Sequence, residues 1–348
     1  MPISLTRRHF LATTAAAGLI TGFPAIVRAQ SKTIVTTLFG GAYEEHYRRI
    51  VLDPFAAAHG VEFVIKYGSA DEWLNNAIVN RNDPEIDLPF LSLPVAMRAI
   101  RVPDLFLELT PNDVPNLADV HPIFRDVYEN KAVGFNYVDY GILYREDMVE
   151  KPITSWADLW DPSLAGKILA PAASAGSMYE FVMIAAKLAG DGSDWTKGVE
   201  KLKELKPNIA RWFNTSNEVD GLIQRKEAGV AAGFGGFRSH ALIDGGVPGK
   251  FVIPSEGAPM GVLSYHVPAN HPNRDLLLEF VNFALAPEQQ AAFGNAMPTG
   301  VTNSKAVLDP AVASKIAPAD QLLRIDWPSI QSQFTEITQR MQQEVISG

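Results

Sequence analysis

The stretch that decides the fold is ITSWADLWDPSLAGKILAP, residues 153–171. The hydroxyl pair Thr154-Ser155 comes before WADLW, and Asp158 would lie in the first turn of a helix, where the helix dipole favours an anion. Pro162 would end this short helix. The apolar run Ile168–Ala170 then follows a Gly-Lys turn and is typical of a buried strand. The stretch therefore predicts a helix, a loop and a strand at the edge of an α/β domain.

Length and composition set the outer limits. The chain has 348 residues and 47% of them are hydrophobic, which is enough to bury the cores of two domains. The net charge of −9 argues against nucleic acid and anionic membranes as partners. The absence of cysteine excludes disulfides, thiolate catalysis and cysteine-bound metal. After the N-terminus, no apolar run reaches the roughly 20 residues that a membrane-spanning helix needs.

Residues 1–29 have the features of an export signal. TRRHFL, residues 6–11, matches the twin-arginine pattern, and a weakly apolar segment leads from it to small residues around Ala29. The alternative is a general secretory signal with an incidental arginine pair. By either route we expect the mature chain to begin near Gln30 and to be periplasmic.

Two strand–helix–strand units are predicted at the start of the mature chain, with strands at 32–38, 61–67 and 87–92. Such units imply a parallel sheet whose strand ends meet at one edge, where Gly40-Gly41 and Ser92 would lie together. Backbone N–H groups at a glycine-rich helix start can hold a polar or anionic ligand group. These residues are therefore candidates for ligand binding.

The rest of the chain alternates between helices and short strands. We expect extended crossings between two lobes at 132–143 and 258–267, and a second glycine-rich turn before a helix at Gly233–Arg238. The expected division is residues 30–135 and 262–297 for lobe 1, and residues 136–261 and 298–348 for lobe 2. Ser174 or Ser177 would cap a helix over 174–190. The last helix carries an apolar stripe that predicts packing on the core: Ile330, Phe334, Ile337, Met341 and Val345.

No catalytic motif is present. The sequence contains no G-x-S-x-G, H-E-x-x-H, P-loop or G-x-G-x-x-G, and no two of its seven histidines are spaced i, i+4. We therefore expect binding and no enzymatic activity, with no catalytic residue, no metal site and no cofactor.

Several segments resemble the spermidine/putrescine-binding family of bacterial periplasmic solute-binding proteins. They are TSWADLWDP with the following GKI, and PSEGAPMGVLSYHVPANHPNRDLLLEFVNFALAPEQQ at residues 254–290. The segments GGAYEEHYRR and DPFAAAHGVEF also resemble the first-lobe opening of the wider group of solute-binding proteins. The resemblance implies an α/β fold of the two-lobe periplasmic binding protein type (type II), in which each lobe is a mixed sheet flanked by helices and hinge segments join the lobes. It also implies a monomer that captures a small solute between its lobes and delivers it to the membrane permease of an ABC importer.

The family's polyamine-binding positions are only partly retained. The aromatic positions fall on Phe39, Tyr43 and Phe234, and a serine position falls on Ser92. The positions that carry a tyrosine, an acidic pair, a Trp-x-Asp and a glutamine fall on Pro94, Gly176 and Tyr179, Gly261 and Leu263, and Pro328. A dication without carboxylate partners would lose several kcal/mol per charge, at least to order of magnitude.

The retained residues suit a small zwitterionic or anionic solute, amino acid-like or phosphonate-like. The complete set of candidate ligand-binding residues is Phe39, Gly40, Gly41, Tyr43, Ser92, Ser174, Ser177, Tyr179, Phe234 and Arg238. Polyamine binding is the first alternative, and Arg238 could instead be a solvated helix residue. A ferric-iron site, an enzyme on the same fold and a structural or chemosensory protein are further alternatives. No neighbouring tyrosine pair supports iron, because Tyr137, Tyr140 and Tyr144 are spaced apart.

Overall fold

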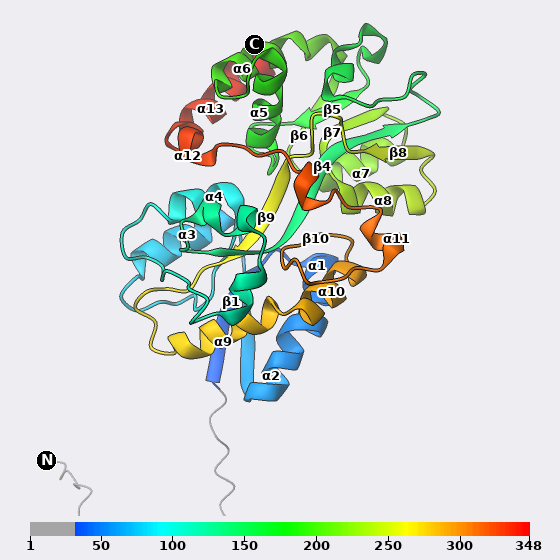
Figure 1. Ribbon diagram of the computed structural model, residues 1–348. Helices are drawn as coiled ribbons and strands as arrows, with labels where there is room; N and C mark the ends of the chain where they lie inside the picture. The colour runs from blue at the N-terminus through cyan, green and yellow to red at the C-terminus, as the bar shows by residue number, and fades with distance from the viewer. Residues whose placement is uncertain (1–31) are drawn as a thin grey trace, which may run out of the picture. The chain divides into compact units, whose positions relative to one another are not determined.

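A computed structural model describes residues 32–348 (Figure 1). The expected export signal at residues 1–29 lies outside the described residues. The strands are β1 (Lys32–Leu38), β2 (Val61–Tyr67), β3 (Phe90–Ser92), β4 (Val133–Arg145), β5 (Ile168–Pro171), β6 (Ile209–Phe213), β7 (Val230–Gly235), β8 (Gly249–Val252), β9 (Met260–Tyr265) and β10 (Gly300–Val301). The helices are α1 (Gly41–Tyr47), α2 (Asp53–His59), α3 (Ala70–Val79), α4 (Leu93–Ala99), α5 (Met178–Ala189), α6 (Trp195–Glu204), α7 (Ser216–Gln224), α8 (Gly236–Asp244), α9 (Arg274–Ala284), α10 (Pro287–Ala296), α11 (Pro310–Ala313), α12 (Trp327–Ile330) and α13 (Phe334–Arg340).

One long strand joins the two halves of this α/β fold. The first half of β4 pairs antiparallel with β9 from Val133 to Asp139, and its second half pairs with β7 and β8 from Tyr140 to Arg145. The resulting strand order is β3-β9-β4-β7-β5-β6, while β1 and β2 form a separate parallel pair. We call the part around β1–β3 and β9 lobe 1, and the part around β5–β8 lobe 2 (Figure 1).

The crossings lie close to where the sequence predicts them, at the middle of β4 and at the start of β9. A third connection follows β10, which pairs with the lobe 1 half of β4 at Tyr137 and Asn136. We therefore propose that the second lobe 1 segment extends past residue 297 to about residue 305. At this third connection the backbone of Ala317 is held at both polar groups. Its C=O accepts a hydrogen bond from the Tyr137 hydroxyl at 2.7 Å, and its N–H donates to the Asp139 carboxylate at 2.9 Å.

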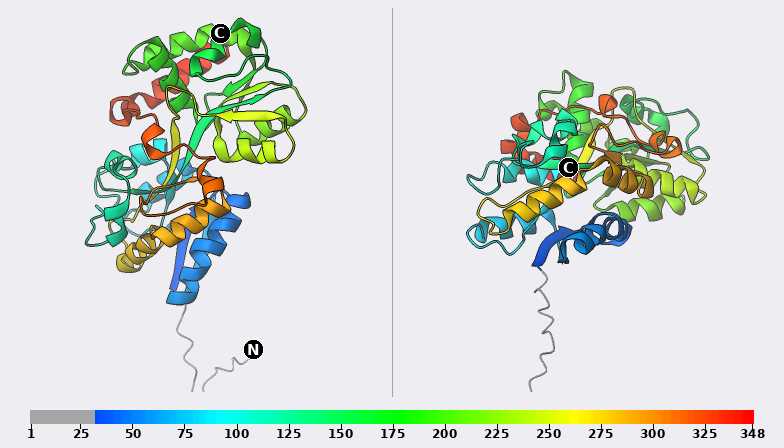
Figure 2. Two further views of the ribbon diagram at one scale, coloured as in Figure 1. Left: turned by 45° about the vertical axis from the view of Figure 1, so that its right-hand side comes forward. Right: turned by 60° about the horizontal axis from the view of Figure 1, so that its bottom comes forward.

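Helices cover both lobes. In lobe 1, α9 and α10 from late in the sequence lie beside α1 and α2 from its beginning (Figures 1 and 2). In lobe 2, α13 and the π-helix that continues it, Met341–Ile346, pack on α6, which packs on α5 (Figure 2). The predicted apolar stripe of the C-terminal helix is buried at all five positions. None of the described helices combines the length and apolar character needed to cross a membrane.

The stretch at 153–171 folds as a short helix, a loop and a strand, although the helix is of the 3₁₀ type, Trp156–Trp160. Ser155 and Asp158 form a reciprocal capping box at its start. The indole of Trp156 is buried and donates to Gly257 O at 2.9 Å, which ties this segment to the chain that leads into β9. β5 then lies between β6 and β7, and its carboxyl end points toward the loop before α5.

Some elements differ from the sequence expectation. Helix α5 begins at Met178 instead of Ser174, because residues 172–177 form turns. The C-terminal helix is interrupted, since α12 and α13 are separated by a 3₁₀ turn, Gln331–Gln333. Helices α4 and α7, which line the region between the lobes, carry no strong sequence signal and were not expected.

Candidate functional site

A cleft of about 750 Å³ lies between the lobes, beside the stretches of β4 and β9 that pass from one lobe to the other. Its lobe 1 side consists of the loop after β1, the start of α4 and the chain between α10 and β10. Its lobe 2 side consists of the start of α5, the start of α7 and the start of α8. The lining residues are Phe39, Gly40, Gly41, Ala42, Tyr43, Ser92, Leu93, Pro94, Val138, Tyr140, Gly176, Glu180, Ser216, Asn217, Phe237, Arg238, Gly261, Val262, Leu263, Met297 and Thr299.

The lobe 1 candidates all lie on this lining. Phe39 is 51% exposed and packs one side of its ring on Trp73. Gly40 and Gly41 have φ angles of 83° and 70°, which favour glycine, so the tight turn after β1 explains this pair. The hydroxyl of Tyr43 donates to Asn136 Oδ1 at 2.9 Å, and burial raises its pKa. Ser92 ends β3 and precedes α4 without capping it.

Arg238 lies on the lobe 2 side, but it already has partners. Its guanidinium pairs with the Asp220 carboxylate, and Nη2 donates to Asn217 Oδ1 at 2.6 Å. Both partners belong to α7, so Arg238 links α8 to α7. The positive charge is thus balanced within lobe 2, and Nη1 makes none of these bonds.

Glu180 is the unexpected member of the cleft. Its side chain is 1% exposed, and neither carboxylate oxygen has a hydrogen-bond partner among the described residues. Burial raises its pKa to about 8. Tyr140 lies near it, and the pKa of this phenol is raised first by burial and then by the charge of Glu180. A buried carboxylate without a donor is costly to keep ionised unless a cation joins it.

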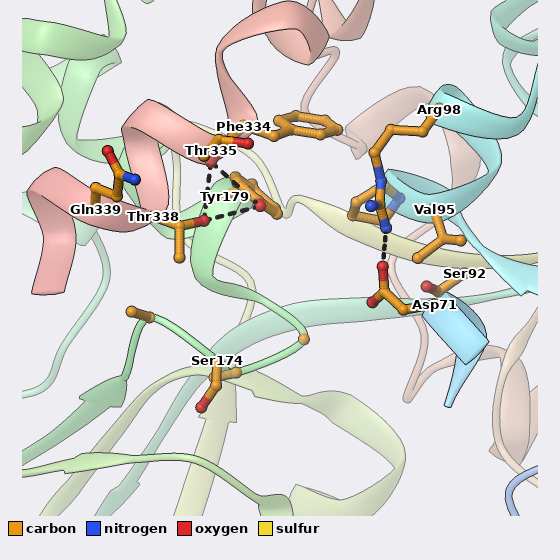
Figure 3. A pocket seen from close by; sticks show the side chains of 14 residues that line it. Asp71, Ser92, Val95, Arg98, Ser174, Tyr179, Phe334, Thr335, Thr338 and Gln339 are labelled. Atoms are coloured by element: carbon orange, nitrogen blue, oxygen red, sulfur yellow. Dashed lines mark hydrogen bonds and ion pairs between the residues drawn. The ribbon is translucent and has the colours of Figure 1, made fainter. Parts of the chain in front are cut away.

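A second cavity of about 500 Å³, the side pocket, opens from the cleft and shares Ser92, Pro94 and Gly176 with it. Figure 3 shows that Tyr179 and the C-terminal helix α13 form one wall, with Tyr179 hydrogen-bonded to Thr338 at 3.0 Å. The ion pair of Arg98 and Asp71 stands on the opposite, lobe 1 wall (Figure 3). Ser174 also lines this pocket and donates to Asn214 Oδ1 at 2.6 Å.

The structure places two candidates outside both linings. Ser177 is buried, and its hydroxyl donates to Gly233 O at 2.8 Å, so it fastens the start of α5 to β7. Phe234 is 1% exposed and packs against Phe213 in the core of lobe 2. The aromatic side chain that this part of lobe 2 places on the cleft is instead Phe237, three residues further along, where the chain has turned from β7 into α8.

Several lining residues were not among the sequence candidates, and three of them matter for the chemistry of the cleft: Glu180, Tyr140 and Thr299. Glu180 stands one position after Tyr179, where an aligned acidic residue was sought, so inspection of the neighbouring position would have found it. Tyr140 lies in the first crossing, and a Cβ on Gly261 would stand 2.5 Å from its hydroxyl. Gly261 is therefore needed to leave room for the Tyr140 ring. Thr299, whose buried hydroxyl has no partner among the described residues, carried no sequence signal.

Comparison with known proteins agrees with this geometry. The profile of the bacterial extracellular solute-binding protein family matches residues 51–319. The spermidine/putrescine-binding periplasmic protein of Escherichia coli K12 is 26% identical over 294 residues, which cover 80% of this chain and 81% of that protein. The gamma-aminobutyric acid-binding protein of Pseudomonas aeruginosa PAO1 is 23% identical over 293 residues, which cover 80% of this chain and 79% of that protein.

Solved structures share the fold. An ABC transporter protein from Clostridium perfringens superposes with a TM-score of 0.78 at 24% identity, covering 90% of this chain and 99% of that one. A receptor for gamma-aminobutyric acid (GABA) superposes with a TM-score of 0.78 at 21% identity, covering 89% of this chain and 97% of that one. The two-lobe architecture expected from the sequence is confirmed.

Proposed function

The chain belongs to the family of bacterial extracellular solute-binding proteins, and we propose that its cleft captures a small amino acid-like zwitterion whose ammonium group pairs with Glu180. As a member of this family the protein is the solute-binding component of an ABC transporter. The family consists of binding proteins that hand small solutes to a membrane permease. The identity of the solute is the subject of the proposal.

The observation that carries the proposal is the buried, unpaired carboxylate of Glu180 on the cleft wall. An ammonium group supplies the donors that this carboxylate lacks, and charge-assisted hydrogen bonds of this kind are short and strong. Tyr140 and Phe237 on the same lining present aromatic rings, which also favour a cation. An anionic solute without an amine would leave Glu180 unpaired.

A single buried carboxylate matches a single ammonium group. The other end of the solute meets a less charged region, because Arg238 is balanced by Asp220. There the hydroxyls of Ser92 and Thr299 line the cleft, together with the Arg238 guanidinium. These groups suit a carboxylate, which needs hydrogen-bond donors, better than they suit a second ammonium. The relative that binds gamma-aminobutyric acid supports a solute of this class.

Thermal unfolding of the purified protein with a solute panel tests the proposal. The panel contains 4-aminobutyrate, other ω-amino acids, α-amino acids, putrescine, spermidine, aminophosphonates and plain dicarboxylates. A solute present at about 100 times its Kd adds about 2.7 kcal/mol to the free energy of unfolding and raises Tm by several degrees. We expect amino acid-like zwitterions to do so and plain dicarboxylates not to.

Two variants sharpen the test. Glu180→Gln keeps the shape of the side chain and removes its charge, so it should weaken zwitterion binding by tenfold or more. Glu62→Gln changes an exposed glutamate on β2 that belongs to neither lining, and it should bind like the parent protein. If Glu180→Gln binds the best solute of the panel as tightly as Glu62→Gln does, the proposed role of Glu180 is wrong. If putrescine and spermidine alone stabilise the protein, the solute is a polyamine.

We also propose that the N-terminal segment directs export by the twin-arginine route and that the exported protein is a monomer. The pattern TRRHFL supports the route. Replacing Arg7 and Arg8 with lysine keeps the positive charge and should leave the precursor in the cytoplasm, whereas a general secretory signal would tolerate the change. Light scattering after gel filtration would give a mass of about 38.0 kDa or slightly less for a monomer.

A further inference from the structure

We infer that the empty cleft carries Glu180 as a neutral carboxylic acid and that capture of an ammonium-bearing solute displaces its proton, so that loading is coupled to the release of one proton. The inference rests on the proposed function, because it needs a solute whose ammonium group reaches Glu180. It adds a regulatory property: the affinity for the solute depends on the acidity around the protein.

The geometry gives the first reason. The Glu180 side chain is 1% exposed, lies on the cleft wall and receives no hydrogen bond on either oxygen from the described residues. In such a place the ionised form has lost its hydration without gaining donors, while the neutral form loses much less. Burial raises the pKa of Glu180 to about 8, and this shift also favours the neutral form at physiological pH.

The surroundings give the second reason, because the charged groups on the packed elements are directed to other partners. On α6, Lys201 pairs with Glu204 and Lys203 pairs with Glu200. On the 3₁₀ helix before β5, Asp158 accepts hydrogen bonds from its own capping residues. The other titratable or charged groups on neighbouring elements include Tyr179 and Lys187 on α5 itself, Lys197 on α6, Asp139, Tyr140 and Arg145 on β4, Arg340 on α13 and Arg238 on α8.

None of these groups hydrogen-bonds to Glu180, because neither of its oxygens has a partner among the described residues. Arg145 pairs with Asp147, and Asp139 is an acid that accepts a hydrogen bond from Ala317 N–H. Lys187 donates to Glu256 O, and Arg340 pairs with Glu344. Arg238 pairs with Asp220. The two phenols, Tyr140 and Tyr179, have pKa values raised mainly by burial and are neutral at physiological pH. The ammonium group of the solute would therefore be the first cation to reach the carboxylate.

Loading exchanges the proton of Glu180 for the ammonium group of the solute. The O–H bond of the Glu180 carboxylic acid breaks, and its proton passes to water. The carboxylate that forms accepts hydrogen bonds from the ammonium group, which keeps its own protons. Because only the ionised fraction binds, the affinity should rise about tenfold per pH unit well below the pKa of the empty site and level off above it.

Calorimetric titration of the protein with 4-aminobutyrate, or with putrescine if only polyamines bind, measures the proton directly. At pH 6.5, titrations are made in phosphate and in Tris, two buffers with different ionisation enthalpies. The difference between the two binding heats, divided by the difference between those enthalpies, gives the number of protons released. We expect close to one proton for the parent protein and none for Glu180→Gln. We also expect a 10- to 50-fold gain in affinity between pH 6 and 8 in the parent and a flat profile in Glu180→Gln.

Binding of the amine without proton release and without pH dependence would overturn the inference and leave the proposed function standing. A second measurement does not depend on binding. The infrared difference between the empty parent protein and empty Glu180→Gln at pH 6.5 should contain the C=O band of a protonated carboxyl group, which disappears by pH 9.5. Absence of that band would also overturn the inference, even if no solute of the panel bound and the proposed function had failed.

Discussion

A carboxylate placed at residue 176 should convert the cleft toward diamines. Gly176 lines both the cleft and the side pocket. The sequence resemblance aligns it with an acidic position of the polyamine-binding family. A Cβ there would meet no atom within 4 Å, and its φ angle is not in the left-handed region. Gly176→Asp therefore adds a carboxylate in open space near Glu180 at little cost to the fold.

The size of the effect follows from the Coulomb energy. Two unit charges about 5 Å apart interact by about 3 kcal/mol at an effective dielectric constant of 20. Desolvation and the lost freedom of the aspartate offset part of this, which leaves about 1 to 2 kcal/mol, or roughly 5- to 30-fold in affinity. The second ammonium of putrescine would gain this energy. The carboxylate of 4-aminobutyrate would lose a similar amount, so the ratio of the two affinities should change by tenfold or more.

Isothermal titration of both solutes into Gly176→Asp and Gly176→Asn provides the assay. The asparagine variant has the same shape without the charge, and it controls for the loss of glycine flexibility. Equal putrescine affinities in the two variants would refute the reasoning, because they would show that residue 176 does not face the solute. A tighter affinity of Gly176→Asp for 4-aminobutyrate would refute it as well.

Three further changes test other parts of the structure. Phe234→Ala should lower the free energy of unfolding by about 3 to 5 kcal/mol in urea denaturation, because it empties a buried core site. Phe237→Ala should weaken solute binding and lower the free energy of unfolding much less. The reverse pattern would show that Phe234 contacts the solute and that Phe237 belongs to the core. Gly261→Ala should weaken binding at least tenfold in calorimetry, because its Cβ would force the Tyr140 ring out of place; unchanged affinity would show that Tyr140 does not contact the solute. Burial raises the pKa of Asp139 to about 6, so the native state holds this proton more tightly than the unfolded chain and loses stability as the pH rises through that value. The free energy of unfolding of Asp139→Asn relative to the parent should therefore increase by about 2 kcal/mol between pH 4 and 7 in urea titrations, and a constant difference would contradict the shift.

Periodicity and turn chemistry predicted most of the fold. The strands at 32–38 and 61–67 and the crossings within β4 and β9 appear where alternation and apolar runs place them. Elements with weak patterns were missed, such as α7, whose sequence SNEVDGLIQ carries few apolar residues. The late start of α5 has a similar cause. The sequence offers two hydroxyl residues as possible caps, Ser174 and Ser177. Ser177 takes the N-cap position, but neither hydroxyl caps the helix, because Ser177 donates to Gly233 O in β7 and Ser174 donates to Asn214 Oδ1.

The site was harder to predict than the fold. The lobe 1 side of the cleft follows from loops at strand ends, which topology brings to one edge, and Phe39, Tyr43 and Ser92 all lie on the lining. The lobe 2 side depends on the direction of side chains at the transition from turn to helix. There a shift of one residue separates Tyr179 in the side pocket from Glu180 in the cleft, because successive residues of a helix point about 100° apart. The exchange of Phe234 for Phe237 has the same origin at the transition from β7 to α8.

These transitions also explain how one fold can serve different solutes. The capping box at Ser155 and the buried indole of Trp156 fix the approach to β5, and β5 lies between two other strands, so the start of the next loop is rigid. Residues 172–177 leave that rigid base as turns, and Gly176 has open space around it. A substitution in this loop can therefore change the charge of the cleft without disturbing the core. Glu180 differs, because its helix position is buried and α5 packs closely on α6. An acidic residue at position 176 of the loop can therefore be gained or lost as the solute changes. Glu180 on α5 is instead part of the packed lobe, and for this reason we assign the ammonium group to Glu180.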